Sequence, residues 1–167
     1  MMILRFHEND TEEVVSLFYE TVHSVNARDY SREQVEAWAA LEDKSERINR
    51  WKRSLNENLT FVVKVNDRIV GFADLTFNGY LDRLFVHKEY QRQGVASLLV
   101  DKLESEAKRL KLQAIETESS ITAKAFFTQR GYVTVRQQTV ERKGVYLTNL
   151  KMRKELCATS FTRTIHE

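Results

Sequence analysis

The apolar residues of this chain change their spacing twice, and this change excludes both an all-helical fold and an all-β fold. Between residues 11 and 56 they recur every three or four positions, as on one face of a helix. From 61 to 86 they form short β-branched and aromatic runs separated by turn residues. Helical spacing returns over 95–110. The sequence therefore predicts a mixed α+β domain.

The order of elements can be read along the chain. Asn66-Asp67 and Asn78-Gly79 are turn pairs that predict two successive hairpins and hence a three-strand meander. The predicted strands are 2–7, 61–65, 69–77, 80–86, 113–118 and two around Arg142-Lys143-Gly144; the predicted helices are 11–26, a short helix after Ser31, 44–56, 95–110 and 121–130. This order favours a largely antiparallel sheet, with right-handed crossovers where strands are parallel.

Two helix starts carry capping signals. Asp10 followed by Glu13 resembles an N-cap with its reciprocal partner, and Ser31 followed by Gln34 forms a second such pair. Both predict where a helix begins.

Length and composition bound the organisation. The 167 residues predict one domain, which we place at 1–153, with a loose tail over 154–167. Cys157 is the only cysteine, which excludes an internal disulfide framework and favours a reducing compartment such as the cytoplasm. No apolar run is long enough to predict a membrane span. A net charge of +2 argues against a dedicated polyanion binder.

Glycine is scarce, so its positions are informative. Gly94 lies between a polar loop and an amphipathic helix, with Arg92 beside it and the small residues Ala96 and Ser97 after it. The free amides of a first helical turn and a nearby cation suit a pyrophosphate. The alternative is that Gly94 only relaxes a strand-to-helix turn. Gly71, inside a predicted strand, indicates close packing against its backbone.

Two motifs resemble the GNAT superfamily of acetyl-CoA-dependent N-acetyltransferases. Gln91-Arg92-Gln93-Gly94-Val95-Ala96 matches its Q/R-x-x-G-x-G/A signature, and the segment 123–132 resembles its A-x-x-F-Y-x-x-x-G-F helix end. The element order agrees from residue 2 to about 153, and several segments resemble the bacterial YafP-like branch. The resemblance implies a GNAT-type fold, a twisted and mostly antiparallel sheet of about seven strands flanked by four to five helices.

The resemblance also implies a cofactor site for acetyl-CoA. In this family the strand before the glycine turn separates from its neighbour and pairs with the pantetheine arm. The residues carried over to that site are Leu84, Phe85, Val86, Gln91, Arg92, Gln93, Gly94, Val95, Ala96, Ser97, Ser120, Lys124 and Phe127. Ser120 could instead cap the following helix, and Lys124 could be a solvated helix residue.

The implied reaction is direct attack of a primary amine on the acetyl thioester. The backbone amide of Val86 would polarise the thioester carbonyl. Asp82 is the candidate base, on the strand face that it is expected to share with Tyr80 and Leu84, with a surface ion pair as the alternative. Phe127 stands where many members carry a tyrosine that acts as the acid, and phenylalanine cannot donate a proton. Tyr146 is a substitute candidate, whereas Tyr132 is expected to pack in the core.

The substrate side of this family is built by the first helices and the loops at the open end of the sheet. His23, Tyr30, Trp38 and Tyr80 are the candidates here. Trp38 could be a core residue, and His23 could interact with the end of its own helix. His87 is expected in the loop beside the phosphates. The four histidines show no metal-ligand spacing, so no metal site is predicted.

Three functions follow from these observations. The first is an N-acetyltransferase acting on a small-molecule or peptide amine. The second is a coenzyme A-binding sensor with little catalysis, which the missing tyrosine favours. The third, suggested by basic runs near 108–111, 142–143 and 151–154, is action on nucleic acid or tRNA. The resemblance also implies a possible homodimer.

Overall fold

A computed structural model describes residues 1–156. One seven-stranded sheet runs through this part of the chain in the order β1-β2-β3-β4-β5-β7-β6. The strands are β1 (Met2–Arg5), β2 (Leu59–Val65), β3 (Arg68–Leu75), β4 (Tyr80–Val86), β5 (Ala114–Ser120), β6 (Val133–Arg142) and β7 (Val145–Glu155). The α-helices are α1 (Thr11–Ser24), α2 (Arg32–Trp38), α3 (Lys44–Glu57), α4 (Val95–Arg109) and α5 (Lys124–Gln129). The predicted mixed fold, with about seven strands, and the predicted order of elements along the chain are confirmed.

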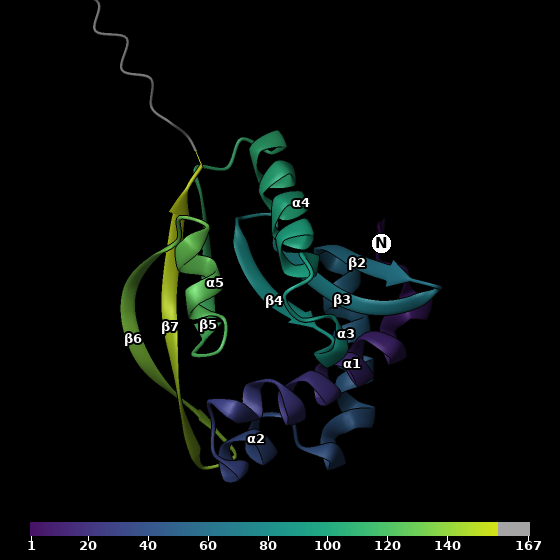
Figure 1. Cartoon of the computed structure of the whole chain (residues 1–167), viewed down its shortest axis with the longest axis vertical. Coiled ribbons are helices and arrows are strands. Elements are labelled where there is room, and N and C mark those ends of the chain that lie inside the picture. Colours follow the sequence, from purple (N-terminus) through teal and green to yellow (C-terminus); the bar gives the residue numbers. More distant parts are fainter. Residues whose placement is uncertain (157–167) are drawn as a thin grey trace, which may run out of the picture.

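The helices form two layers, and each layer has its own apolar core. Leu99 and Leu103 of α4 and Phe127 of α5 pack with β2–β5 and β7 in one cluster. Phe18 of α1 and Trp51 of α3 pack with the opposite face of β2 and β3 in the other. Figure 1 shows α4 and the three N-terminal helices around a sheet whose two halves separate.

That separation lies between β4 and β5. The two strands are parallel and pair only at Tyr80 with Glu116 and Leu81 with Thr117. Beyond Leu81, β4 pairs with β3 alone. Because β5 pairs along its whole length with β7, the sheet opens as a V between β4 and β5 (Figure 1).

A β-bulge changes the faces of β4. Asp74 of β3 lies opposite Arg83, but Leu75 lies opposite Leu81, so Asp82 has no opposing residue. Strict alternation along this strand would put Tyr80, Asp82 and Leu84 on one face, and that prediction is wrong. Leu81 and Leu84 both contact the core on the α4 side, because the extra residue shifts the alternation.

One of the two predicted helix caps is wrong. The Asp10 side chain makes no cap contact with α1. It accepts a hydrogen bond from the His7 backbone at 2.9 Å, closing a capping box one turn earlier. The Glu13 carboxylate reaches the Ile69 amide of β3 instead. The Ser31–Gln34 capping box is confirmed at the start of α2, with both reciprocal hydrogen bonds present.

The strand ends differ slightly from the predicted ones. β3 stops at Leu75, because Thr76 begins the turn that leads through Asn78 and Gly79 to β4. β7 continues to Glu155, which lies opposite Ala114, so residues 154 and 155 of the predicted tail are part of the sheet. Leu156 follows the strand, and residues 157–167 of that prediction lie outside the described residues.

A buried ion pair joins β3 to β4. The fully buried Asp74 accepts hydrogen bonds from Arg83 and Asn58, each at 2.9 Å. Its second carboxylate oxygen, Oδ1, has no hydrogen-bond partner in the described part of the chain. Burial raises the pKa of Asp74 to about 6, although Arg83 and Asn58 both oppose that rise. Desolvation therefore outweighs the attraction of the neighbouring guanidinium.

Gly71 tests the contact between the sheet and α4. A Cβ on Gly71 would lie 2.6 Å from Cγ1 of Val95 and 3.2 Å from Cδ1 of Leu99. Gly71→Ala should therefore cost about 1–3 kcal/mol, measured by urea unfolding. In the double variant Gly71→Ala/Val95→Ala the clash is relieved. The double variant should therefore lose less free energy of unfolding than the two single variants lose together. Simple additivity would contradict this account of Gly71.

Asp74 should make stability depend on pH in an unusual direction. Since its folded pKa is raised above the ordinary value, the folded state binds the proton more tightly than the unfolded state. The stability that Asp74 contributes is therefore full below about pH 4 and lost as pH rises through 6, by up to about 3 kcal/mol. Urea unfolding of the wild type and of Asp74→Asn between pH 4 and 7.5 measures this. The free energy of unfolding of the wild type, relative to that of Asp74→Asn, should decline as the pH rises through 6 and then level off. A difference that does not change with pH would contradict the assignment.

Candidate functional site

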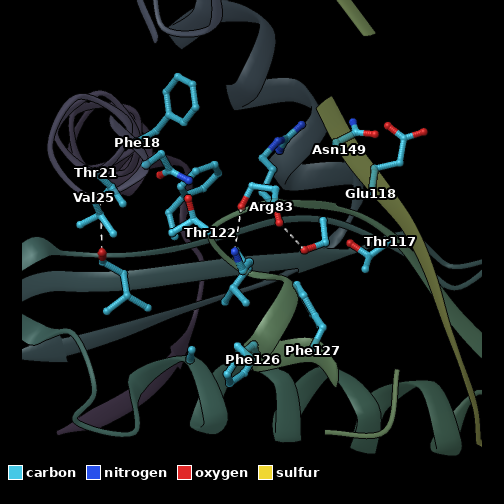
Figure 2. A pocket seen from close by; sticks show the side chains of 18 of the residues that line it. Phe18, Thr21, Val25, Arg83, Thr117, Glu118, Thr122, Phe126, Phe127 and Asn149 are labelled. Carbon is cyan, nitrogen blue, oxygen red and sulfur yellow. Dashed lines mark hydrogen bonds between the residues drawn. The ribbon is translucent and has the colours of Figure 1, made fainter. Parts of the chain in front are cut away.

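The opening between β4 and β5 holds a cleft of about 830 Å³. Figure 2 shows Phe18, Thr21 and Val25 on one side, Glu118 and Asn149 on the other, and Phe126 and Phe127 below. Its walls come from α1–α3, β4, β5, β7, α5 and the turn before α4. The volume is in the range of a ligand site.

The cleft brings together most of the residues predicted from the sequence. Its lining includes Tyr30, Trp38, Tyr80, Asp82, Leu84, Phe85, Val86, Gln91, Arg92, Gly94, Val95, Ala96, Ser97, Ser120 and Phe127. These residues come from distant parts of the chain and from different layers. The separated strands, and not sequence proximity, gather them.

The open edge of β4 faces this cleft. The His87 amide donates to Val70 of β3 at 2.8 Å, so the backbone groups of Val86 point to the other side of the strand. The Val86 carbonyl accepts there from Gln91 Nε2 at 2.6 Å and from Thr21 Oγ1 at 3.3 Å. The backbone of β4 therefore offers hydrogen-bonding groups to the cleft.

The turn at Gly94 forms an open cradle. Gly94 has a φ of 84°, and a Cβ built on it would meet nothing within 4 Å. Arg92 also has positive φ, at 58°. Two residues of this kind, separated only by Gln93, shape the turn so that several amide groups are exposed at the start of α4, where the helix dipole favours an anion.

The two glutamines of the motif support this turn. Besides its bond to the Val86 carbonyl, Gln91 Nε2 lies 3.4 Å from the His87 carbonyl, and Gln93 Nε2 donates to the Glu89 carbonyl at 3.0 Å. Gln93 is exposed and does not line the cleft. Their side chains fix the loop backbone, which the sequence motif did not distinguish from ligand contact.

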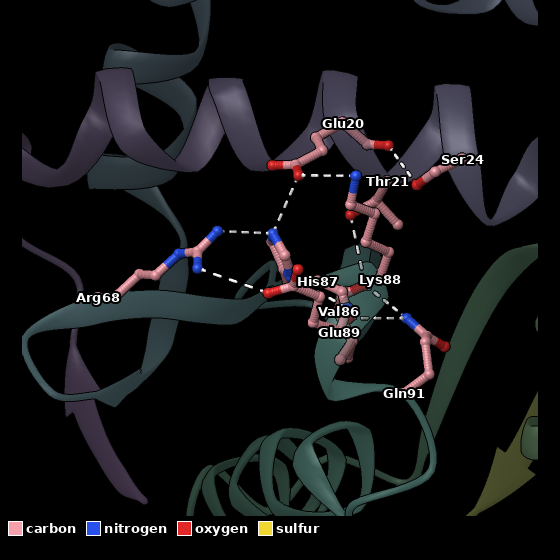
Figure 3. Close-up of polar contacts among 9 residues, drawn as sticks. All are labelled: Glu20, Thr21, Ser24, Arg68, Val86, His87, Lys88, Glu89 and Gln91. Carbon is pink, nitrogen blue, oxygen red and sulfur yellow. Dashed lines mark hydrogen bonds and ion pairs between the residues drawn. The ribbon is translucent and has the colours of Figure 1, made fainter.

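His87 lies elsewhere than expected. It is buried, and its Nε2 lies 2.8 Å from Arg68 and 3.1 Å from Glu20, while Nδ1 accepts from the Glu89 amide (Figure 3). It does not line the cleft. The prediction that it lies beside the phosphates is wrong, because its ring is held between α1 and β3 and braces the loop from behind.

Three other predicted residues also stay outside the cleft. His23 is exposed and contacts the Ala39 carbonyl through Nε2 at 2.7 Å. Tyr146 is 64% exposed on β7, next to the buried Leu147 that does line the cleft. Lys124 is exposed at the start of α5. Strand alternation explains why the Tyr146 side chain points away from the cleft, because successive side chains point to opposite faces and Leu147 points inward.

Two predicted residues have structural bonds as well as a place in the lining. The Tyr30 hydroxyl donates to Thr148 of β7 and accepts from the Ile121 amide, both at 2.9 Å. It thereby ties the helical layer to the β5–β7 half of the sheet, and burial raises its pKa. Ser120 Oγ accepts from the Ala123 amide at 3.1 Å, at the entry to α5.

The charged groups of the cleft were partly missed by sequence reasoning. Asp82 forms an ion pair with Arg83 at 3.2 Å, and across the opening the Glu118 side chain forms no ion pair or hydrogen bond within residues 1–156. Tyr80 lies near both carboxylates, and its pKa is raised by burial first and then by Glu118 and Asp82. A charged residue inside the β5 segment was the available signal for Glu118.

The residues fit a coenzyme A thioester. An open strand edge can pair with the pantetheine amides, and the cradle at Gly94 can take the pyrophosphate. Acetyl-CoA, when bound, supplies an activated acetyl group. Among residues 1–156, no three His, Cys, Asp or Glu side chains are gathered where they could share a metal ion. In the same part of the chain, no helix combines the length and apolarity that a membrane span requires.

Known proteins resemble this chain over nearly its whole length. The family described as Acetyltransferase (GNAT) domain matches residues 26–156. The N-acetyltransferase YafP of Escherichia coli is 35% identical over 153 residues, covering 92% of this chain and 95% of that protein. A GCN5-related N-acetyltransferase from Rhodopseudomonas palustris has a TM-score of 0.85 at 32% identity, covering 93% and 95% of the two chains.

A more distant structure shows the same fold with its cofactor. The PaiA N-acetyltransferase of Thermoplasma acidophilum, in complex with coenzyme A, has a TM-score of 0.71 at 19% identity and covers 93% of this chain and 99% of its own. The open β4 edge, the Gly94 cradle and these relatives agree. The chain therefore belongs to the GNAT superfamily, in its YafP-like branch, and is an acetyl-CoA-dependent N-acetyltransferase.

Proposed function

We propose that this enzyme acetylates a primary amine of a small molecule or peptide by direct attack in the cleft between β4 and β5. The observation that carries the proposal is the open β4 edge directly beside the Gly94 cradle. An amine and a thioester held on the same edge meet with much of the entropic cost of encounter removed. The new C–N bond forms as the C–S bond breaks, and the amine loses one proton.

The cofactor contacts are part of this proposal. The backbone of Leu84, Phe85 and Val86 would pair with the pantetheine arm, and the amides from Arg92 to Ser97 would hold the pyrophosphate. The outward-facing Val86 amide would donate to the thioester oxygen. Ser120 and Phe127, both in the lining, would complete the contact surface.

We assign the general base to Asp82, at the bulge of β4. Its side chain is about one-third exposed and reaches the cleft, where it could accept the amine proton directly or through water. Glu118 is the competing carboxylate, and within residues 1–156 its side chain forms no ion pair. The proposal therefore needs both residues tested side by side.

Water is the proposed source of the proton for the leaving thiolate. Phe127 is buried against Phe126 and Tyr132 and has no hydroxyl. The Tyr132 hydroxyl contacts Glu104 inside the core, and Tyr146 is outside the cleft. A thiol with a pKa of about 8.5 leaves with little assistance.

Action on nucleic acid has less support. Several basic residues that suggested it bind carboxylates of this chain, including Arg109 with Glu106, Arg153 with Glu116 and Lys154 with Glu104. A homodimer is supported by the exposed Val133 and Val135 on the edge strand β6. The single cysteine supports a reducing compartment such as the cytoplasm.

Gly94→Val tests the cradle. The added side chain would fill the open space and strain a backbone with positive φ. We expect coenzyme A binding, measured by titration calorimetry, to be lost while circular dichroism still shows a folded domain. Gly144→Val is the matched control, because Gly144 also has positive φ and open surroundings but lies in the β6–β7 turn. Retained affinity in Gly94→Val would contradict the proposal.

Asp82→Asn tests the base, with Glu118→Gln as its counterpart. Thiol release from acetyl-CoA is measured with an alkyl amine across a pH series. Asp82→Asn should lower kcat/KM by about a hundredfold near neutral pH. Activity should recover toward higher pH, because an ordinary alkyl amine has a pKa near 10.4. If Asp82→Asn keeps the wild-type profile and Glu118→Gln loses it, Glu118 is the base.

A further inference from the structure

One end of the cleft is an aromatic pocket, which we call the acceptor pocket. It is formed by Phe18, Trp38, Trp51 and Phe85, with Arg47 above them. The Phe18 ring lies 4.8 Å from Trp51, 5.1 Å from Phe85 and 6.4 Å from Trp38, measured between ring centres. Rings from α1, α2, α3 and β4 therefore give this pocket apolar walls.

Arg47 places a poorly compensated positive charge in this pocket. Its guanidinium carbon lies 4.8 Å from the Phe18 ring centre and 5.9 Å from that of Trp51. The guanidinium donates to the Tyr19 hydroxyl at 3.0 Å and to the Trp38 carbonyl at 3.3 Å, both uncharged groups. Its Nε is buried and has no hydrogen-bond partner within residues 1–156.

Carboxylates of the chain do not neutralise this charge. Within residues 1–156 no acidic side chain forms an ion pair with Arg47. Asp43 lies near enough to influence it, but the Asp43 carboxylate is bound by Lys143 at 2.8 Å. Burial lowers the pKa of Arg47, as expected for a cation that lacks a counter-charge.

The other arginines of the cleft differ from Arg47. Arg83, which is also partly buried, is bound by Asp74, Asp82 and Ser54. Arg50 is exposed and pairs with Glu46 at 2.8 Å. Arg28 and Arg142 are exposed at the rim. Among these arginines, Arg47 is the one that is partly buried and pairs with no carboxylate within residues 1–156, so an anionic group of a ligand could serve as its partner.

The position of Arg47 relates it to the reacting end of the cleft. Phe18 contacts Arg47 on one side and Phe85 on the other, and Phe85 precedes Val86 on the open β4 edge. The carboxylates Asp82 and Glu118, near Tyr80, suit the amine end, and Arg47 suits an anion.

We propose that the acceptor is an amine on a compact apolar or aromatic scaffold that also carries a carboxylate, and that Arg47 binds this carboxylate. The inference rests on the proposed function, whose transfer step it leaves unchanged. A planar carboxylate matches a guanidinium and forms strong charged hydrogen bonds with it. The aromatic walls bind the scaffold between the two ends. Polycationic amines are disfavoured, since Arg47 repels a second ammonium group.

Binding without acetyl transfer gives the first test. Trp38 and Trp51 are the only two tryptophans of the chain, and both line the acceptor pocket. Phenylpropionate should therefore change the intrinsic fluorescence of the full chain, and phenylpropanol, which lacks the carboxylate, should bind at least about tenfold more weakly. Arg47→Gln should remove this difference, whereas Arg50→Gln should keep it. Equal binding of both probes to the wild type would overturn the proposal.

Acetyl transfer gives the second test, with matched amines. The pairs are L-phenylalanine with phenethylamine, and para-aminomethylbenzoate with benzylamine, assayed by thiol release from acetyl-CoA. In at least one pair the carboxylated member should have a kcat/KM higher by about tenfold or more. Arg47→Gln should lower kcat/KM for that member by about the same factor and leave its uncharged counterpart within about twofold.

The outcomes separate the two proposals. Thiol release with uncharged amines but no preference for a carboxylate in either pair overturns this inference and leaves the proposed function standing. An equal loss for both members in Arg47→Gln overturns it as well, because a purely structural role would affect them alike. If the fluorescence difference is found and no amine releases thiol, the proposed function fails while the carboxylate site stands.

Discussion

The site depends on the loss of pairing between β4 and β5. Two residue pairs hold these strands together at one end, and β4 then continues with β3 alone. An unpaired strand edge inside a domain exposes hydrogen-bonding groups that need partners. Here they face a cleft of about 830 Å³, where a ligand with amide groups can provide them. The arrangement is stable because the apolar cluster on the α4 side includes residues of β2–β4 as well as of β5 and β7, and because β5 and β6 both pair with β7.

Besides the shared apolar cluster, a few polar contacts hold the two halves relative to each other. Tyr30 bridges the helical layer to β7 and to the segment before α5, and Gln34 of α2 donates to the Tyr146 carbonyl at 3.0 Å. On the other side, the buried His87 and the Gln91 side chain hold the loop between β4 and α4 (Figure 3). The cradle at Gly94 is therefore built on a braced loop, which favours a preorganised site.

The charged groups of the cleft suit different parts of the two ligands. Arg92 and the amides at the start of α4 suit the phosphates, Asp82 and Glu118 suit an amine, and Arg47 suits an acceptor carboxylate. The acid of many family members is replaced by Phe127, whose ring packs at 5.1 Å from Tyr132. This departure fits a reaction in which removal of the amine proton matters more than protonation of the thiolate.

Local sequence signals determined the class of the fold and the cofactor end of the site. Hydrophobic spacing, turn pairs and the Gly94 motif act over a few residues, so the elements, their order and the glycine turn could be predicted. The family resemblance added the separated strand and the acetyl group donor.

Only the tertiary structure decided the acceptor end and the roles of several polar residues. The bulge at Asp82 arises from the register between β3 and β4, so strand alternation alone gave the wrong face. Three predicted residues lie outside the cleft for different reasons. His23 contacts the Ala39 carbonyl, and His87 contacts Glu20 and Arg68. Tyr146 points outward because its neighbour Leu147 takes the inward position. Arg47 gained its place from packing among three helices. Such contacts join residues far apart in the chain, and no local pattern encodes which of them will meet.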